Sequence, residues 1–178
     1  MTTPAPRFRV ELAHDAAGIE AAQRLRYEVF VEELGGDGPL VDHAARLERD
    51  RFDPVFDHML LRDLRRGGEV VGVYRLLREE GAARAGQFYS EDEYDLAPLR
   101  ASGRRLLELG RSCVARPYRG GEALYHLWQG LAHYVERHGI EVLFGVASFH
   151  GTDVAALAQL LSLLHHRHLA PPALRVRA

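Results

Sequence analysis

The sequence predicts an α/β (α+β) protein in which helices flank a mixed β-sheet. Segments with the apolar patterns of strands alternate along the chain with segments whose apolar residues recur every three to four positions, as in helices. The predicted order is β-α-β-β, an irregular stretch, and then β-α-β-α. With 178 residues, 47% of them hydrophobic, the chain is long enough to bury a core. We therefore expect one domain over residues 1–178.

The first half begins with a strand over residues 8–12, where apolar and polar side chains alternate. A helix follows, with Asp15 as its N-cap and Gly35-Gly36 at its end. Residues 35–54 contain glycine, proline and charges without any period, which predicts a long loop. Loops of this length in compact domains are often functional.

Two strands are expected near residues 56–63 and 69–78, and the turn Arg66-Gly67-Gly68 joins them into a hairpin. Residues 80–102 have no clear period and predict irregular structure, with a helical turn around residues 96–101.

The second half opens with a strand over residues 104–115 and a helix that follows Gly121 and ends near His138. The almost wholly apolar segment 141–147 is typical of a strand in a sheet covered on both faces. Thr152-Asp153 caps a last helix that reaches about Leu164. The helix before His138 is expected to bury one apolar stripe, made of Leu124, Leu127, Trp128, Leu131 and Val135.

Composition excludes several classes of protein. A net charge of -2 argues against non-specific nucleic-acid binding. The single cysteine, Cys113, excludes an intramolecular disulfide and a cysteine-based zinc site, and the histidines at 165–168 are too close together to predict a metal site. No apolar run reaches the roughly 20 residues that span a bilayer. Residues 1–9 lack a signal pattern, so we expect a cytoplasmic protein.

Charged residues inside apolar segments are the first candidates for a site. Glu108 and Arg111 lie in one predicted strand, on opposite faces by alternation, and a bulge at Gly110 could bring them together. The alternatives are a structural ion pair or an exposed sheet edge. Arg26 and Arg75 have equally apolar neighbours and could instead extend to the surface.

A glycine-containing loop precedes the helix of the second half. It lies between a strand and a helix N-terminus, where backbone N–H groups and the helix dipole favour an anion. Arginines in the loop could add donors to a phosphate. The alternative is an ordinary turn with solvated arginines, and the loop acids Asp50 and Asp53 could likewise be simply solvated. The loop residues in question are Arg116, Arg119, Gly120 and Gly121.

The ordered set of motifs resembles one family. The segments Leu25–Phe30, Asp50-x-x-Asp53, Gly72–Leu76 and Glu108–Arg111 resemble the signature of acyl-homoserine-lactone synthases of the GNAT superfamily. The resemblance is closer to their sister group, the ornithine-lipid N-acyltransferases, also called hemolysin-like. The segments that carry it are Gly86–Leu96 and Leu107–Val114, and the likeness spans roughly residues 7–153.

Two departures refine the resemblance. Glu122 and Leu124 stand where the usual GNAT phosphate loop has glycine or alanine, which favours a carrier-protein donor over coenzyme A. No tryptophan occurs in Gly35–Gly38, where autoinducer synthases carry one, and this favours ornithine over S-adenosylmethionine. Ornithine-group proteins extend beyond position 178, so the last strands of a GNAT sheet are expected to be missing here.

The resemblance implies transfer of a (3-hydroxy)fatty acyl group from acyl carrier protein to the α-amine of L-ornithine. It implies no tightly bound cofactor and no metal, with acyl-phosphopantetheine (or acyl-CoA) as co-substrate, and contact with the inner face of the plasma membrane is possible. The thioester arm would enter between strands 104–115 and 141–148. The alternatives are a synthase using S-adenosylmethionine, a coenzyme A-dependent acetyltransferase, and a non-catalytic acyl- or carrier-binding module.

Site roles are also implied by the resemblance. Buried Glu108 would accept the proton of the amine, and Arg111 would be the second catalytic residue. The acceptor would be bound by Arg26, Phe30, Asp50, Asp53 and Arg75. The donor would be bound by Ser112, Val114, Arg116, Arg119, Gly120 and Gly121.

Overall fold

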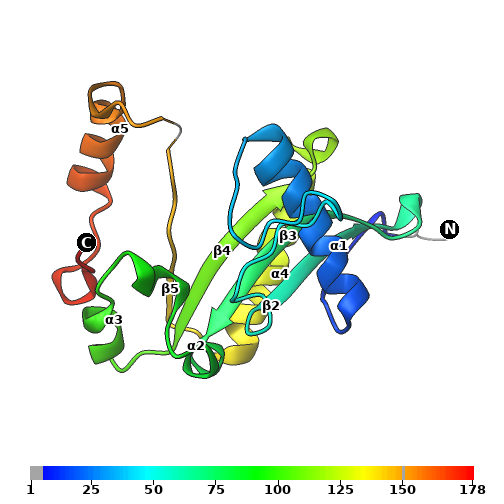
Figure 1. Ribbon diagram of the computed structural model, residues 1–178. Helices are drawn as coiled ribbons and strands as arrows, with labels where there is room; N and C mark the ends of the chain where they lie inside the picture. Colours follow the sequence, from blue (N-terminus) through cyan, green and yellow to red (C-terminus); the bar gives the residue numbers. More distant parts are fainter. Residues whose placement is uncertain (1–5, 150) are drawn as a thin grey trace, which may run out of the picture.

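The computed structural model describes residues 6–149 and 151–178 and contains the expected mixed sheet. Residues 1–5, part of the stretch considered for a signal pattern, lie outside the described residues. Strands β1 to β4 are antiparallel to their neighbours, and β5 pairs parallel with β4 (Figure 1). The strands are β1 Phe8–Leu12, β2 Asp57–Asp63, β3 Glu69–Arg78, β4 Leu106–Val114 and β5 Val142–Phe144.

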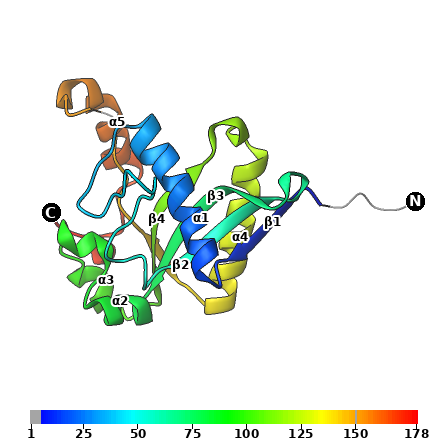
Figure 2. The ribbon, with the colours of Figure 1, turned by 45° about the vertical axis from the view of Figure 1, so that its right-hand side comes forward.

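Two long helices cover the sheet. Helix α1 (Ala16–Arg26) lies on one face and α4 (Glu122–His138) on the other, as Figures 1 and 2 show. Leucines and valines of the central strands fill the space between them, and their side chains are fully buried. Shorter helices α2 (Glu79–Ala85) and α3 (Ala97–Ala101) lie at one end of the sheet, beside β5. The predicted element order and the hairpin are confirmed.

Helix α1 begins where the sequence indicates, since the Asp15 carboxylate accepts a hydrogen bond from the Gly18 amide at 2.8 Å. It does not continue to Gly35 as an α-helix. From Tyr27 to Glu33 the chain forms a π-helix, whose wider turn the apolar spacing did not indicate. Such segments are rare and are frequent at functional sites.

Three details of the prediction are wrong. Residues 80–85, expected to be irregular, belong to α2, which begins at Glu79. The buried face of α4 consists of Ala123, Leu127, Leu131 and Tyr134, so Leu124 and Trp128 remain 48% and 55% exposed. Strand β5 has three residues and is only partly covered, since Leu143 at its centre remains 43% exposed.

The sheet opens on one side of β4. Pairing with β5 covers Leu106 to Glu108, and a side chain at Gly145 would bring a Cβ to 2.3 Å from the Leu109 carbonyl oxygen. After this close approach, residues 145–149 leave the sheet (Figure 1). On the β3 side, β4 holds an extra residue, because Val73 faces Cys113 while Arg75 faces Gly110. The expected bulge and the separation of the two strands are thus confirmed.

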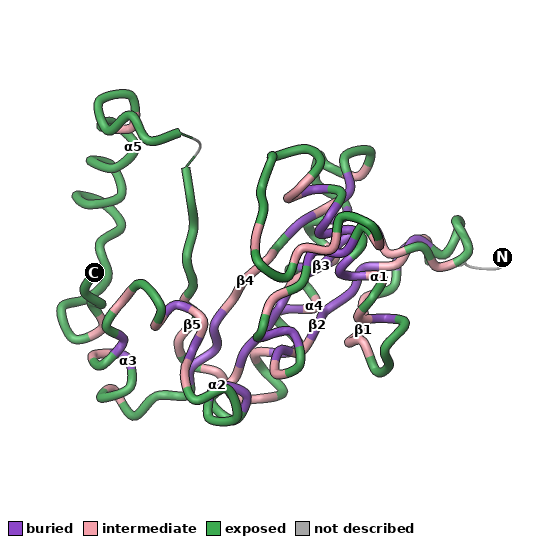
Figure 3. Tube along the Cα trace, in the orientation of Figure 1, coloured by how far each residue is buried: buried purple, intermediate pink, exposed green. Residues whose placement is uncertain are grey.

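The last helix, α5 (Val154–Arg167), starts at the predicted N-cap Asp153 and has no buried residue (Figure 3). The tail after it returns to α3, where the backbone of Arg177 pairs with that of Asp95. Among the described residues, no helix is both long and apolar enough to cross a membrane.

Candidate functional site

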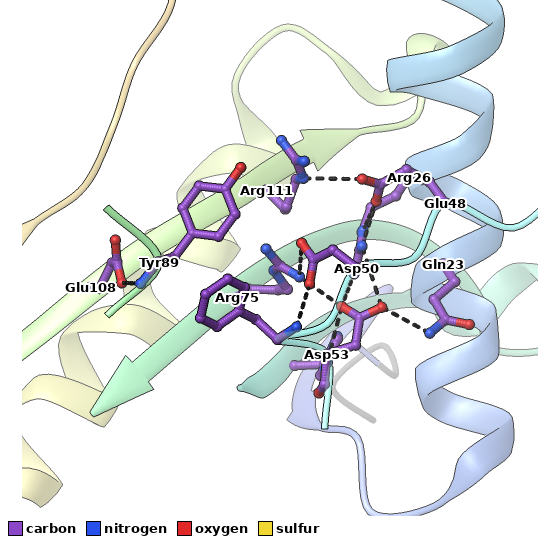
Figure 4. Close-up of polar contacts among 11 residues, drawn as sticks. Gln23, Arg26, Glu48, Asp50, Asp53, Arg75, Tyr89, Glu108 and Arg111 are labelled. Atoms are coloured by element: carbon purple, nitrogen blue, oxygen red, sulfur yellow. Dashed lines mark hydrogen bonds and ion pairs between the residues drawn. The ribbon is translucent and has the colours of Figure 1, made fainter. Parts of the chain in front are cut away.

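A cluster of three arginines and three carboxylates lies between α1, the loop after it and the two central strands (Figure 4). We refer to it as the charged cluster. Its residues come from four separate segments, which the sheet and α1 bring together. The members are Arg26, Glu48, Asp50, Asp53, Arg75 and Arg111.

Asp53 is the centre of the charged cluster. Its Oδ1 lies 2.6 Å from a guanidinium nitrogen of Arg26 and 2.7 Å from one of Arg75. Its Oδ2 accepts a hydrogen bond from the Gln23 amide at 2.9 Å. Arg26 also pairs with Glu48, and Arg75 lies 2.7 Å from Asp50. Arg26 and Arg75 are 0% and 1% exposed, so neither extends to the surface.

The arginines keep these acids ionised. Burial opposes ionisation of Asp53, but the charges and hydrogen bonds of Arg26 and Arg75 lower its pKa to about 2. Burial likewise opposes ionisation of Asp50, and Arg75 lowers the pKa of that carboxyl below its usual range. Asp53 is buried and Asp50 is half-buried, so the alternative of fully solvated loop charges is wrong.

Acid should lower the free energy of unfolding over the pH range in which Asp53 becomes protonated. Because its pKa is held at about 2, against 3.8 as the ordinary value, its ionised form stabilises the fold above that ordinary value. This contribution, about 2 kcal/mol, is lost as the pH falls from about 4 to about 2. Urea unfolding across this range measures it. In Asp53→Asn the free energy of unfolding should fall less steeply over the same interval, and equal slopes would contradict the assignment.

Sequence reasoning missed two residues of this region. Glu48 is buried and links Arg26 to Arg111, whose Nε lies 3.1 Å from a Glu48 oxygen. His58 is buried beneath Asp53, whose backbone carbonyl is 3.0 Å from its Nε2, and burial lowers its pKa. A polar residue at an inward position of a strand could have indicated His58. Nothing in the loop pattern distinguishes Glu48 from its solvated neighbours.

A cavity of about 570 Å³ opens beside the charged cluster. We call it the polar cavity because charged side chains stand in its wall, among apolar residues such as Val31, Leu34 and Leu40. Glu48, Asp50 and Arg111 contribute to its wall, and so do the rings of Phe30 and Tyr89. The Arg111 guanidinium lies 5.6 Å from the Phe30 ring centre and 5.7 Å from that of Tyr89. Arg111 occupies the bulge with a φ of 49°, a left-handed conformation that directs its side chain out of the strand alternation.

Among the residues that the structure describes, the wall of this cavity does not include Arg26, Asp53 or Arg75. They lie behind it, in contact with Asp50 and Glu48. Of the residues expected to bind the acceptor, Phe30 and Asp50 therefore face the cavity directly, and the other three support them.

Glu108 is 1% exposed and faces the turn Phe88–Asp92. Its two carboxylate oxygens accept hydrogen bonds from the Tyr89 and Ser90 amides, both at 2.7 Å, and from the Ser90 hydroxyl. Burial raises the pKa of Glu108, while these hydrogen bonds lower it, and the net shift is upward. The bulge does not join Glu108 to Arg111, which pairs with Glu48 instead. For Glu108 both the ion-pair and the exposed-edge alternatives are thus wrong, whereas Arg111 does form an ion pair, with Glu48 as its partner.

An apolar groove, also of about 570 Å³, lies on the other side of the same turn. Residues 142–147 form one wall, the tail residues 169–176 form another, and Leu96 and Leu99 close the end. Ser90 is among its lining residues, whereas Tyr89 lines the polar cavity. The turn Phe88–Asp92 therefore separates the two spaces.

The glycine-containing loop lies at the far end of β4. Gly120 and Gly121 have φ values of 129° and 128°, which favour glycine, and α4 begins directly after them without a side-chain cap. Arg119 donates to the Val114 carbonyl and pairs with Glu33 at 2.8 Å. Ser112 and Arg116 are exposed and Val114 is half-buried. The expected donor residues thus lie along one end of β4 and the start of α4.

Comparison with known proteins assigns the chain to a family. Residues 25–129 match the family described as acetyltransferase (GNAT) domain. The L-ornithine N(alpha)-acyltransferase of Rhodobacter capsulatus is 63% identical over 175 residues, which cover 96% of this chain and 68% of that protein. The chain belongs to the L-ornithine N(alpha)-acyltransferases, within the GNAT acyltransferases. This confirms the family that the motifs resemble.

The enzyme of the same name from Brucella abortus is 46% identical and shares 96% of this chain. The chain spans 63% of the length of that relative. Among solved structures, an N-acyl amino acid synthase from uncultured soil microbes superposes with a TM-score of 0.56 at 17% identity, covering 92% of this chain and 80% of its own. An AHL synthase gives 0.56 at 19% identity, with 87% and 77% covered. These two confirm the fold.

Proposed function

We propose that the protein transfers a (3-hydroxy)fatty acyl group from acyl carrier protein to the α-amine of L-ornithine. The observation that carries the proposal is the opening of the sheet at the bulge of β4, with a charged, polar cavity on one side of the Phe88–Asp92 turn and an apolar groove on the other. A charged acceptor and a fatty acyl chain need these two kinds of surface. The shared name of the curated relatives supports the same acceptor.

The polar cavity suits an amino acid with an extra positive charge. Its wall holds four carboxylates and three guanidiniums, so groups of both signs face an acceptor that itself carries both. Arg111 would bind the α-carboxylate, for which the guanidinium fork is suited. Asp37 and Asp92 at the rim would attract the side-chain ammonium of ornithine. In this orientation the α-amine is the group nearest the bulge.

The donor end of β4 suits a phosphopantetheine arm. Arg116 and Arg119, with the free amides at the start of α4, would bind its single phosphate. Arg116 and Arg119, both exposed, would also attract the acidic surface of a carrier protein, whereas the exposed Arg104 and Arg105 lie at the other end of β4. The pantetheine would pass along Ser112 and Val114, and the acyl chain would lie in the apolar groove.

The chemistry is aminolysis of a thioester. The neutral α-amine nitrogen attacks the carbonyl carbon, a C–N bond forms and the C–S bond breaks. The proton that nitrogen loses ends on the leaving thiolate, through water in the polar cavity. Backbone N–H groups on the free edge of β4, beyond the last pair with β5, would stabilise the tetrahedral oxyanion.

One set of incubations tests the proposal. The protein is mixed with 3-hydroxyacyl carrier protein or acetyl-CoA, and with L-ornithine or S-adenosylmethionine, and products are read by mass spectrometry. We expect acylated ornithine from the carrier-protein donor. A lactone product from S-adenosylmethionine, an acetylated product, or donor binding without product would each overturn the proposal in favour of a different function.

We also propose a cytoplasmic protein that touches the inner face of the plasma membrane, since its acylated product is amphiphilic. Helix α5 exposes Leu160, Leu161 and Leu163, and no acidic residue occurs from Val154 to Ala178. Such a surface suits anionic lipid. Flotation with vesicles that contain phosphatidylglycerol should carry the protein upward, and Leu160→Gln/Leu163→Gln should weaken this. Equal recovery of both proteins would contradict the membrane contact.

A further inference from the structure

The turn Phe88–Asp92 stands between the two spaces that the substrates would occupy. Tyr89 faces the polar cavity, and the next residue, Ser90, faces the apolar groove. Two consecutive residues therefore line different spaces: Tyr89 the polar cavity proposed for the acceptor, and Ser90 the apolar groove proposed for the acyl chain. A shift of this turn would change both spaces at once.

Glu108 is what fixes the turn to the sheet. It lies on β4, opposite the end of β5, and each of its oxygens accepts an amide hydrogen bond from the turn. Buried amides without a partner are costly, so the turn is bound tightly to this carboxylate. The Ser90 hydroxyl adds a third hydrogen bond to the same group.

The geometry gives Glu108 little access to a substrate. Within the described part of the chain, Glu108 lines neither the polar cavity nor the apolar groove. Donors of the turn occupy both carboxylate oxygens. A general base must come within hydrogen-bond reach of the proton that it takes, directly or through one water.

The Tyr89 side chain links the turn to the arginines of the charged cluster. Its ring packs against Phe52 at 5.3 Å between centres, and the guanidinium carbons of Arg75 and Arg111 lie 5.8 Å and 5.7 Å from it. Figure 4 shows the ring between Glu108 and Arg111. The ring thus transmits the position of the turn to the arginine expected to bind the acceptor carboxylate.

We infer that Glu108 is a positioning residue, which holds the Phe88–Asp92 turn so that Tyr89 shapes the acceptor cavity and Ser90 shapes the acyl groove. The inference rests on the proposed function. It differs from the role of proton acceptor that the family resemblance implies, because Glu108 acts through the turn and not on the amine.

Two variants test the inference through kinetics. Glu108→Gln keeps one acceptor oxygen but turns an NH2 toward an amide, and Ser90→Ala removes the hydroxyl bond alone. We expect kcat/KM for ornithine to fall about tenfold to a hundredfold in the first and about threefold to tenfold in the second, mainly through KM. Because both act on one turn, the double variant should be no worse than Glu108→Gln.

The pH profile separates positioning from proton transfer. We expect the acidic limb of the kcat/KM profile to keep its midpoint in Glu108→Gln. The matched control is Asp15→Asn, since the Asp15 carboxylate also accepts a backbone amide hydrogen bond, from Gly18, and residues 15–18 line neither cavity. It should match the wild type. Loss of the acidic limb, with kcat down more than about a thousandfold and Ser90→Ala unaffected, would overturn the inference.

Hydrogen–deuterium exchange tests the same inference without turnover. In Glu108→Gln the Tyr89 and Ser90 amides should exchange at least about tenfold faster than in the wild type. In Asp15→Asn they should not change. If the wild-type protein acylates no ornithine, the proposed function fails while this measurement still reports on the turn. Unchanged exchange in Glu108→Gln would overturn the positioning role.

Discussion

Replacing Asp53 by asparagine is expected to lower the free energy of unfolding by about 3–5 kcal/mol. The Asp53 carboxylate is the shared partner of Arg26 and Arg75, which are both buried. Asparagine has nearly the same shape but no charge, so the two guanidiniums would remain with only Glu48 and Asp50 beside them. A buried charge that loses its partner retains its full desolvation cost.

Urea denaturation near neutral pH measures this change. The control is Glu20→Gln, which removes the partner of Arg24 on the exposed side of α1. It should cost less than about 0.5 kcal/mol, as surface pairs generally do. A similar small loss for Asp53→Asn would show that the charged cluster does not stabilise the fold.

The largest expected effect on substrate binding belongs to Arg111. In Arg111→Ala we expect KM for ornithine to rise about 30-fold to 100-fold, since a charge-assisted pair with the acceptor carboxylate is worth about 2–3 kcal/mol. The donor KM should change little, because Arg116 and Arg119 lie at the other end of β4.

Arg111 also holds a left-handed backbone position, so a backbone effect must be separated from loss of the side chain. Arg111→Gly relieves the backbone conformation and removes the same guanidinium. Equal KM values for the glycine and alanine variants would assign the effect to the side chain. Arg84→Ala, an exposed arginine of α2, serves as the control. An unchanged ornithine KM in Arg111→Ala would contradict its place in the acceptor site.

Much of the sheet is predictable from local pattern. Alternation located β1, the glycine turn located the β2–β3 hairpin, and Asp15 and Asp153 marked the starts of α1 and α5. These features depend on neighbouring residues only. The π-helix from Tyr27 to Glu33 was not predictable in this way, because no spacing or capping residue in the sequence distinguishes it from a continued α-helix.

The sequence indicated several residues of the site by their type and context, but not which residues they contact. Charges inside apolar segments indicated Arg26, Arg75 and Glu108 as candidates, and the structure buries all three, although the pattern alone left an exposed position open for each. Their partners come from distant segments, and spacing along the chain cannot reveal them. Glu48 pairs with Arg26 across 22 positions, and Glu108 accepts hydrogen bonds from a turn 18 and 19 positions away. The exposed Trp128 shows the same limit, since apolar spacing alone does not say which stripe of α4 meets the sheet.

The orientation of the acceptor is the central claim, with the α-carboxylate on Arg111 and the α-amine toward the bulge of β4. Turnover of ornithine labelled with nitrogen-15 at the α-position alone, with 3-hydroxyacyl carrier protein as donor, tests it most directly. Fragmentation of the product should find the label in the new amide nitrogen. Product whose amide carries the unlabelled side-chain nitrogen would show that ornithine binds the other way round.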